Sequence, residues 1–463
     1  MLYTHKYILL SMKFINRKEE MCLLRNAVGK NPLIFVYGRR RVGKTRLLWE
    51  TFKDMRLLYL LCREEELSET LKRLRGKLME VFGDSEIHAR YIKSFDDFFD
   101  YISDKECVVI FDEFPVLAKK HPAILGVLQE YLDMKRKAKN TVILCGSSIS
   151  FMEEIQGYSS PIYGRRSSSL KVKPLQFEDL SDFFPEYSKE ELVKIYACFD
   201  GIPEYLLRIN PENSPEENII ENFFRKGYMY EEAEYLLRYE LRDLATYNTI
   251  LEALGERGRK FNEIHTITGI DKSKLPKYLS VLQNLGIVSR EKPLTAKRKA
   301  RNYIYRISDN YFRFYYTFIY PYKESIEMDM SYVAIEHFKK HFNTYLGHVF
   351  EDIVRQILLK LNKSERLPFK FELIGKWWNR SYEIDLITVN ETQKKVIFWE
   401  VKWANISYRD AERIYKSLKE RAQFVKEYKN YEKYYGIFAR KISVVPENVV
   451  AFDLRRIYFN LRN

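Results

Sequence analysis

A glycine-rich stretch near the N-terminus has the residue types and spacing that bind phosphate groups. Gly38 and the run Gly43, Lys44 and Thr45 fit the pattern G-x-x-x-x-G-K-[ST], between an apolar run and an amphipathic helix pattern. Glycines let backbone N–H groups curl around a phosphate, the lysine reaches the β- and γ-phosphates, and the threonine hydroxyl binds Mg²⁺. The pattern predicts a site for ATP and Mg²⁺, whose lining also includes Arg39, Arg40, Arg41, Val42 and Arg46.

Two acids at the end of a second apolar run supply the partner chemistry. Residues 107–111 lead directly into Asp112 and Glu113, and parallel strands present their carboxyl ends to a bound nucleotide. Asp112 is expected to hold Mg²⁺ through water, and Glu113 to orient the water that attacks the γ-phosphate. Ser147 follows the next apolar run, at 141–146. It either senses the γ-phosphate or caps the following helix.

Two adjacent arginines stand in a predicted loop, at residues 160–170. Arg165 or Arg166 could act as an arginine finger on the γ-phosphate. The finger would act in cis, or in trans between the copies of a homo-oligomer. The alternative is a pair of solvated side chains.

The sequence around these residues predicts an α/β fold, because apolar strand runs alternate with helix patterns. The chain has 463 residues and a net charge of +14, which indicates several domains and an anionic partner, nucleic acid before a membrane surface. The alternative interpretation of the charge is a solvated surface rich in ion pairs. Its apolar runs are too short to span a bilayer. Five cysteines without a C-x-x-C suggest a reducing, cytoplasmic setting. Translation could begin at Met1 or Met12.

Residues 12–240 resemble the archaeal ATPases of the STAND branch of the AAA+ class. The resemblance is carried by FINRKEEMCLLRNAV, GRRRVGKT, VVIFDEF, CGSS, YGRR and FDGIPEYLL. It implies a P-loop core over residues 1–175, with an added strand between the two nucleotide motifs that LLYLLC fits, and a helical lid over 176–243. It also implies that Gly201 and Pro203 contact the adenine, although a Gly-x-Pro is also a simple helix break.

Residues 244–308 have the pattern of a winged helix-turn-helix, with three helical stretches followed by two short strands around a basic turn. The turn at 290–301 has six basic residues and one acid, for a net charge of +5. Contact with DNA phosphates is one interpretation, and packing on the ATPase as a regulatory element is the other. The residues expected to reach DNA are Lys272, Lys274 and Lys277 on the third helix and Lys297, Arg298, Lys299 and Arg301 in the turn.

The C-terminal part contains a second set of residues that could do chemistry. Glu400 and Lys402 alternate along an apolar strand, so they share one face. Asp385 lies on the preceding strand, and Glu351 edges the buried face of a helix. Asp385 and Glu400 could bind Mg²⁺, Lys402 could activate a water, and Glu351 could hold a second ion or a water. The alternative is a surface ion pair.

The predicted order of these elements, α-β-β-β-α-β over residues 340–445, resembles the PD-(D/E)xK nuclease-like domains, with Ile384 in place of the motif proline. The resemblance implies a restriction-endonuclease-like domain over 309–463, either active on DNA or degenerate. The aromatic run at 310–323 could stack on bases or pack internally. We therefore predict an ATP-binding and ATP-hydrolysing protein that acts on DNA, with Mg²⁺-dependent cleavage; an ATP-switched regulator or a signalling scaffold with an inactive nuclease fold is the alternative.

Overall fold

A computed structural model describes residues 14–30, 32–83, 91–134, 139–165, 168–241, 243–297 and 303–455. The chain divides into two compact units, and each is considered by itself. The first unit comprises residues 1–175 with 202–204, and the second comprises 176–201 and 205–463. Met12, Arg166, Arg298, Lys299 and Arg301 lie outside the described residues.

The first unit is built on a parallel sheet of five strands, in the order β2-β3-β4-β1-β5. Strand β4 lies between β1 and β3 in the sheet. Strand β2 lies between them in sequence but at the edge of the sheet. The three inner strands are almost fully buried, as continuous apolar runs in a parallel sheet should be. The strands are β1 (Leu33–Tyr37), β2 (Leu57–Leu61), β3 (Val108–Asp112), β4 (Thr141–Gly146) and β5 (Ser168–Lys171).

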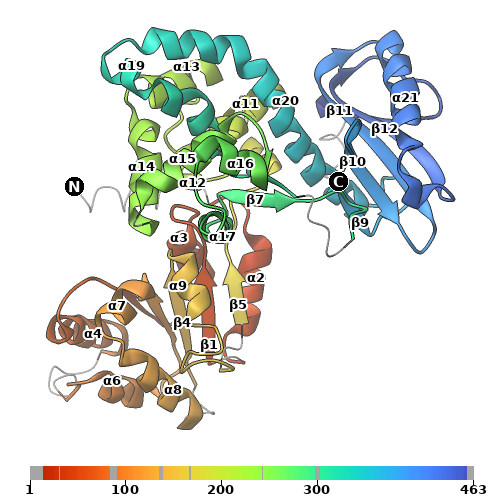
Figure 1. Ribbon diagram of the computed structural model, residues 1–463. Helices are drawn as coiled ribbons and strands as arrows, with labels where there is room; N and C mark the ends of the chain where they lie inside the picture. The colour runs from red at the N-terminus through yellow and green to blue at the C-terminus, as the bar shows by residue number, and fades with distance from the viewer. Residues whose placement is uncertain are drawn as a thin grey trace. The chain divides into compact units, whose positions relative to one another are not determined.

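Helices flank this sheet (Figure 1), and aromatic side chains fill part of the core between them. Phe98, Phe99 and Phe111 meet at ring-centroid distances of 5.2 to 6.2 Å and are completely or almost completely buried. Because β1 and β3 both pair in parallel with β4, the carboxyl ends of these three strands lie at one edge of the sheet. The helices are α2 (Lys18–Ala27), α3 (Lys44–Phe52), α4 (Leu67–Phe82), α6 (Phe95–Ile102), α7 (Phe114–Lys120), α8 (Ile124–Met134) and α9 (Ile149–Glu154).

The second unit begins with short helices whose starts are encoded locally. Ser188 accepts a hydrogen bond from the Glu191 N–H and the Glu191 carboxylate accepts one from the Ser188 N–H, which starts α11 (Lys189–Phe199). Ser214 and Glu217 start α13 in the same way. Helix α12 (Pro203–Leu206) begins at the division between the units. The other elements are η1 (Phe177–Asp179), α10 (Leu180–Phe183), α13 (Pro215–Ile219), η2 (Ile220–Phe224) and α14 (Tyr228–Glu240).

Residues 244–307 form three helices and a small antiparallel sheet with the order β6-β8-β7. The aromatic run that follows is internal. The side chains of Tyr311, Phe314, Tyr315 and Phe318 are completely buried, so this run packs and does not present rings to a ligand. The elements are α15 (Leu244–Gly255), β6 (Arg259–Lys260), α16 (Phe261–Thr268), α17 (Leu275–Asn284), β7 (Val288–Glu291), β8 (Ile304–Ile307), α18 (Asn310–Phe314), η3 (Tyr315–Ile319), η4 (Tyr320–Tyr322) and α19 (Lys323–Glu327).

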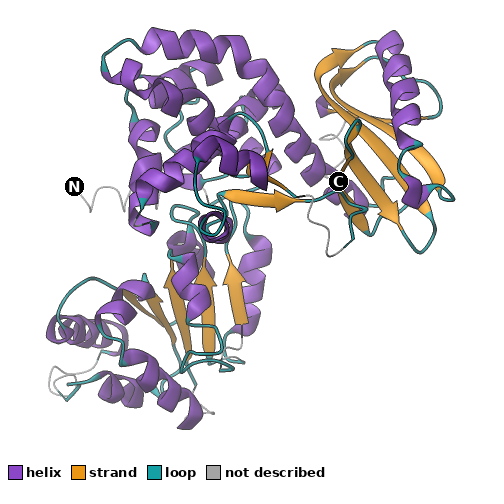
Figure 2. Ribbon diagram, viewed as in Figure 1, coloured by secondary structure: helices purple, strands orange, loops and turns teal. Residues whose placement is uncertain are grey.

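A long helix, α20 (Ser331–Lys363), leads into a second large sheet (Figure 2). This sheet has five strands in the order β13-β12-β11-β10-β9. Strands β9, β10 and β11 are antiparallel, and β11, β12 and β13 are parallel. The element order matches the α-β-β-β-α-β order expected from the sequence. The elements are β9 (Leu373–Trp378), β10 (Glu383–Asn390), β11 (Lys395–Ile406), α21 (Tyr408–Ala422), η5 (Lys426–Tyr428), β12 (Glu432–Ile442) and β13 (Val449–Asp453).

The two faces of this sheet carry different helices. Phe398 on β11 belongs to an apolar cluster with Leu418 of α21. Phe350 on α20 lies 5.2 Å from the Trp403 ring, measured between ring centroids. Because strand side chains alternate, the even-numbered residues of β11 face α21 and the odd-numbered residues face α20. In the part of the chain that the structure describes, no helix has the length and apolar character needed to cross a membrane.

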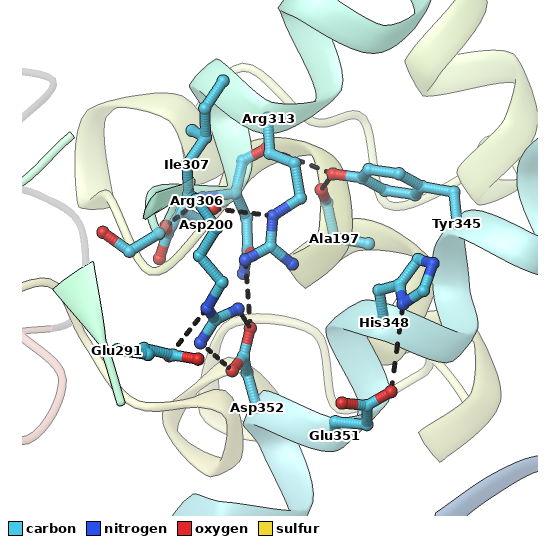
Figure 3. A network of polar contacts seen from close by, with 12 residues as sticks. Ala197, Asp200, Glu291, Arg306, Ile307, Arg313, Tyr345, His348, Glu351 and Asp352 are labelled. Atoms are coloured by element: carbon cyan, nitrogen blue, oxygen red, sulfur yellow. Dashed lines mark hydrogen bonds and ion pairs between the residues drawn. The ribbon is translucent and has the colours of Figure 1, made fainter. Parts of the chain in front are cut away.

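Buried ion pairs tie residues 244–307 to α20 (Figure 3). The Arg306 guanidinium donates to both Asp352 oxygens, at 2.6 and 2.7 Å, and to Glu291 Oε1 at 2.7 Å. Arg313 Nη2 adds a third bond to Asp352, at 3.1 Å. Burial alone would raise the pKa of Asp352, but Arg306 and Arg313 hold it far below its usual range. The carboxylate is therefore charged and fully compensated.

We expect Asp352→Ala to lower the free energy of unfolding of the second unit by about 3–5 kcal/mol, because two buried guanidiniums lose their anion. Urea unfolding followed by tryptophan fluorescence reports on this unit, which contains Trp377, Trp378, Trp399 and Trp403. Asp329→Ala is the matched control, since Asp329 pairs with Lys226 in the same unit but is 89% exposed. Equal effects of the two variants would contradict the expectation.

Candidate functional site

The glycine-rich loop joins β1 to α3 and depends on its two glycines. A Cβ atom at Gly38 would lie 2.3 Å from the Val172 carbonyl oxygen, a distance that no side chain tolerates. Gly43 has a φ of +85° and stands immediately before the first residue of α3, a conformation that strongly favours glycine. The loop can therefore turn tightly enough to aim its N–H groups and the α3 N-terminus at one point.

Lys44 is the first residue of α3 and is 5% exposed. Its Nζ donates to the carbonyl oxygens of Gly38 at 2.9 Å and Arg39 at 3.0 Å. The ammonium group therefore lies across the mouth of the loop, at the place where a phosphate would be cradled.

Asp112, at the end of β3, is a buried carboxylate that is 2% exposed. It accepts hydrogen bonds from Thr45 Oγ1 at 2.6 Å, the Tyr59 hydroxyl at 2.8 Å and the Glu113 N–H at 3.0 Å. All three donors are neutral, and Asp112 has no ion-pair partner among the described residues. A buried anion without a cation is costly, and hard oxygen donors suit Mg²⁺. The residues therefore fit the predicted metal.

Glu113 lies beside this carboxylate in a left-handed backbone conformation, with φ at +54°. Such strain in a non-glycine residue is typical of functional positions. The Ser147 hydroxyl and the Ser147 N–H, at 3.2 Å, both donate to its carboxylate. Ser147 thus fixes the orientation of Glu113 across the ends of β3 and β4; the N-cap residue of α9 is the next one, Ser148, and it makes no side-chain cap.

Two further residues of this site were not anticipated from the sequence. The Tyr59 hydroxyl donates to Asp112, and burial together with Asp112 raises the tyrosine's pKa, so it remains a donor. Arg17 is 6% exposed and donates to the Val42 carbonyl at 3.1 Å, which braces the loop. Tyr59 could have been found from strand alternation in β2. Nothing local singles out Arg17.

The remaining residues predicted for the nucleotide site lie in varied settings. Arg46 pairs with Glu50 on α3, with 2.7 Å between Nη2 and Oε1. Arg165 makes a two-pronged ion pair with Asp133, at 2.7 and 2.8 Å. A Cβ atom at Gly43 would lie 3.7 Å from the Pro203 ring. Gly201 donates its N–H to the Asp200 carboxylate at 2.6 Å. The backbone of Arg39, Arg40, Arg41 and Val42 forms the loop itself.

The described lysines among those predicted for DNA contact, Lys272, Lys274, Lys277 and Lys297, are exposed, but the placement of the first three differs from expectation. Helix α17 begins at Leu275, so Lys272 and Lys274 precede it and only Lys277 lies within it. The shift follows from Pro276, which favours the first helical turn. Asp271 then stabilises the preceding turn by accepting from the Ser273 N–H at 2.6 Å.

The described start of the basic turn is attached to the C-terminal sheet. The Leu294 N–H donates to the Lys376 carbonyl on β9 at 2.8 Å. The Leu294 side chain packs against the apolar cluster beneath α21 and contacts the position where Gly375 lacks a side chain. At least this part of the turn packs on protein; Lys297 is exposed beyond it.

A cavity of about 360 Å³ in the second unit contains two of the predicted catalytic acids. Glu351 on α20 and Asp385 on β10 line it together with Lys376 and His348. Lys376 Nζ forms a close ion pair with Glu351, and the ring of His348 lies 3.8 Å from the other Glu351 oxygen. Asp385 Oδ2 accepts from the Val401 N–H at 2.8 Å.

Glu400 and Lys402 form a separate group on the α21 side. The Glu400 carboxylate is bonded by Arg421 of α21 at 2.6 Å and by Lys402 at 2.7 Å, and neither Glu400 nor Lys402 lines the cavity. Two of the four residues expected around one cavity, Glu351 and Asp385, therefore line it, while Glu400 and Lys402 lie outside its lining but close enough to Asp385 for their charges to shift its pKa. The reason is a register shift in β10 between Ile384 and Ile387, which packs both isoleucines on the α21 face and leaves Asp385 toward α20.

The donors of this region do not fit Mg²⁺ as they stand. Glu351 and Glu400 are already paired with Lys376, Arg421 and Lys402. Within the described ranges, no group of three or more His, Cys, Asp or Glu side chains is placed to hold a metal ion. Asp385 is the exception, because it has no cation of its own in the same part of the chain. Burial, and then the charges of Glu400 and Glu351, raise its pKa to about 7.

This pKa predicts a pH-dependent stability. An unfolded aspartate titrates near pH 4, so between about pH 4 and 7 the folded protein holds a proton that the unfolded chain has lost. The free energy of unfolding therefore falls as the pH rises through this window. We expect Asp385→Asn to raise the unfolding midpoint more at about pH 8 than at about pH 5, measured thermally with a chelator present. Asp329→Asn is the control, and an equal shift at both pH values would count against the expectation.

Comparison with known proteins agrees with the architecture of the first unit. A family model described as an ATPase domain predominantly from Archaea matches residues 14–209. The Walker-type ATPase of Pyrococcus abyssi superposes with a TM-score of 0.52 at 22% identity, covering 65% of this chain and 96% of that one. At this identity the likeness concerns the fold alone, and it confirms the predicted parallel-sheet α/β fold of a P-loop NTPase for the N-terminal part. The Aeropyrum pernix ORC2 protein is more distant, with a TM-score of 0.43 at 13% identity over 70% of this chain and 95% of that one.

Two further matches cover the rest of the chain. A family model described as archaeal and bacterial proteins of unknown function matches residues 315–414, which include Asp385, Glu400 and Lys402. The uncharacterised protein MJECL04 of Methanocaldococcus jannaschii is 37% identical over 449 residues, which is 95% of this chain and 99% of that protein. The chain therefore belongs to one family with the M. jannaschii protein and carries an ATPase domain of archaeal type ahead of a domain of unknown function.

Proposed function

We propose that this protein binds and hydrolyses ATP at the carboxyl edge of its parallel sheet. One observation carries the proposal: a phosphate-sized loop, a buried carboxylate without a cation and a carboxylate in a strained turn all meet at this edge. Lys44, Asp112 and Glu113 supply these features. Each answers a different need of phosphoryl transfer.

The ground-state contacts come from the loop and α3. Backbone N–H groups between Gly38 and Gly43 and the α3 N-terminus bind the β-phosphate. Lys44 exchanges its two carbonyl partners for phosphate oxygens. Thr45 and Asp112 would hold Mg²⁺, which when bound neutralises charge on the β- and γ-phosphates.

Glu113 orients the attacking water and accepts its proton as the bond to the γ-phosphorus forms. Ser147 is a positioning residue, because it holds the Glu113 carboxylate by two hydrogen bonds. Arg165 is paired with Asp133 of its own chain, so we assign it no role as a finger in cis.

Lys44→Ala should abolish nucleotide binding, because it removes the cation that contacts the β- and γ-phosphates. Glu113→Gln should keep binding and reduce turnover by at least about 100-fold, because only the activation of water is lost. A titration with a fluorescent ATP analogue and a phosphate-release assay measure the two effects. Lys53→Ala is the control, because Lys53 is an exposed lysine of the same unit. Normal turnover of the glutamine variant would place the base elsewhere.

We further propose that the second unit binds nucleic acid. The chain's net charge of +14 favours a polyanion. Lys272, Lys274 and Lys277 are exposed around the start of α17. Helix α21 adds five basic side chains against three acidic ones, a net charge of +2.

Mg²⁺-dependent cleavage is a second candidate function. It is favoured by Asp385, a partly buried carboxylate without an ion pair among the described residues, facing a cavity that also contains Glu351. It is opposed by the pairing of Glu400 with Arg421 and Lys402. Because cations already occupy these oxygens, we derive no cleavage step from them.

We expect supercoiled plasmid to remain intact when incubated with the protein and Mg²⁺, with or without ATP, on an agarose gel. Cleavage that Asp385→Ala removes, while ATP hydrolysis continues, would establish the second candidate instead. Asp329→Ala controls for a general loss of charge, and a persisting trace of cleavage in Asp385→Ala would indicate a contaminating nuclease.

A further inference from the structure

Two large aromatic side chains are stacked on the surface of the C-terminal sheet. The rings of Tyr382 and Phe424 lie 4.3 Å apart with an angle of 18° between their planes. Tyr382 is 40% exposed and Phe424 is 46% exposed. Rings that served only to fasten the β9–β10 turn to α21 would be expected to bury their faces, as the stacked Phe398 does below them. Exposed, paired rings are typical of a binding surface.

The pair is held in place from both sides. The Asn379 side chain accepts hydrogen bonds from the N–H groups of Ser381 and Tyr382, each at 2.8 Å, which fixes the turn that presents Tyr382. Arg421 donates to the Glu383 carbonyl at 2.7 Å, and the Phe424 N–H donates to the Arg421 carbonyl at 3.1 Å. The two rings therefore keep their stacked geometry without a ligand, which lowers the entropic cost of binding.

The surroundings of the pair favour an anionic, aromatic ligand. Arg380 is exposed in the same turn, and α21, with its net charge of +2, ends two residues before Phe424. Arg421 also bonds Glu400, so the pair adjoins the polar group of the C-terminal sheet. Asp385 lies three residues along the strand from Tyr382, a span of about 10 Å.

We propose that Tyr382 and Phe424 form a stacking platform for an unpaired base of a single-stranded nucleic acid. The proposal rests on the nucleic-acid binding proposed above and names its substrate class. A base can stack on a protein ring only when it is free of its own neighbours, so the platform selects single strands over duplexes. The basic side chains of α21 would contact the phosphate backbone of the strand. The aromatic rings of the platform carry no preference for DNA over RNA.

The test is fluorescence anisotropy of the full-length protein with labelled oligo-dT, oligo-U and a duplex, without Mg²⁺ or ATP. Tyr382→Ala with Phe424→Ala should weaken single-strand binding about tenfold or more and leave the slope of affinity against salt unchanged, because phosphate contacts persist. Quenching of a fluorescent adenine analogue in the strand should also be lost. Tyr382→Phe with Phe424→Tyr should retain both properties, and comparison of oligo-dT with oligo-U separates DNA from RNA.

Tyr332→Ala is the matched control. Tyr332 is 65% exposed in the same unit, and it lies about 28 Å along α20 from Glu351. The alanine pair should hydrolyse ATP normally, which shows that the chain is folded. The platform is overturned if the wild type binds nucleic acid and the alanine pair binds it equally well, or loses affinity equally for duplex and single strand. In both cases the proposed nucleic-acid binding stands. Absence of binding to any nucleic acid by the wild type overturns both proposals.

Discussion

Removing a carboxylate from water costs several kcal/mol unless positive charge or hydrogen-bond donors replace the lost hydration, and this constraint organises both units of the protein. Asp352 is compensated by Arg306 and Arg313, and that pairing joins the segment with the small sheet to the long helix α20. Glu400 is compensated by Arg421 and Lys402, which joins α21 to β11. At Asp352 and Glu400 the charge is fully compensated, and these ion pairs hold elements of the fold together.

At Asp112 and Asp385 the charge is compensated only in part, so each carboxylate can still take up a cation or a proton. Asp112 receives only neutral donors, so its charge calls for an external cation beside a loop that can hold phosphate. Asp385 receives one backbone N–H, and burial, followed by the charges of Glu400 and Glu351, raises its pKa to about 7. The same residue type is thus left without full compensation in both units: we propose that it binds a metal in the first, and it titrates in the second.

The surface available to nucleic acid follows from how residues 244–307 pack. Leu294 is bound to the edge of β9 by a backbone hydrogen bond and by apolar contact, so this part of the basic turn protects a sheet edge. The exposed lysines before α17, the basic side chains of α21 and the Tyr382–Phe424 platform remain as the exposed features that suit a polyanion. We place recognition of single strands at the platform, where stacking supplements charge.

The sequence by itself determined the nucleotide loop, the buried strands and the order of elements, because Gly38, Gly43 and the apolar runs act through local backbone sterics and hydrophobic periodicity. It also placed Asp112 and Glu113 at a strand end. Only the tertiary structure decided that Tyr59 and Ser147 bond these acids, and that Glu400 pairs with Arg421 and Lys402 outside the lining of the cavity that Asp385 faces. Those outcomes depend on a one-residue register shift in β10 and on side chains far apart in the chain. Local periodicity predicts neither the register shift nor the long-range contacts. A bulge reverses the face on which a side chain lies without altering the apolar pattern that precedes it.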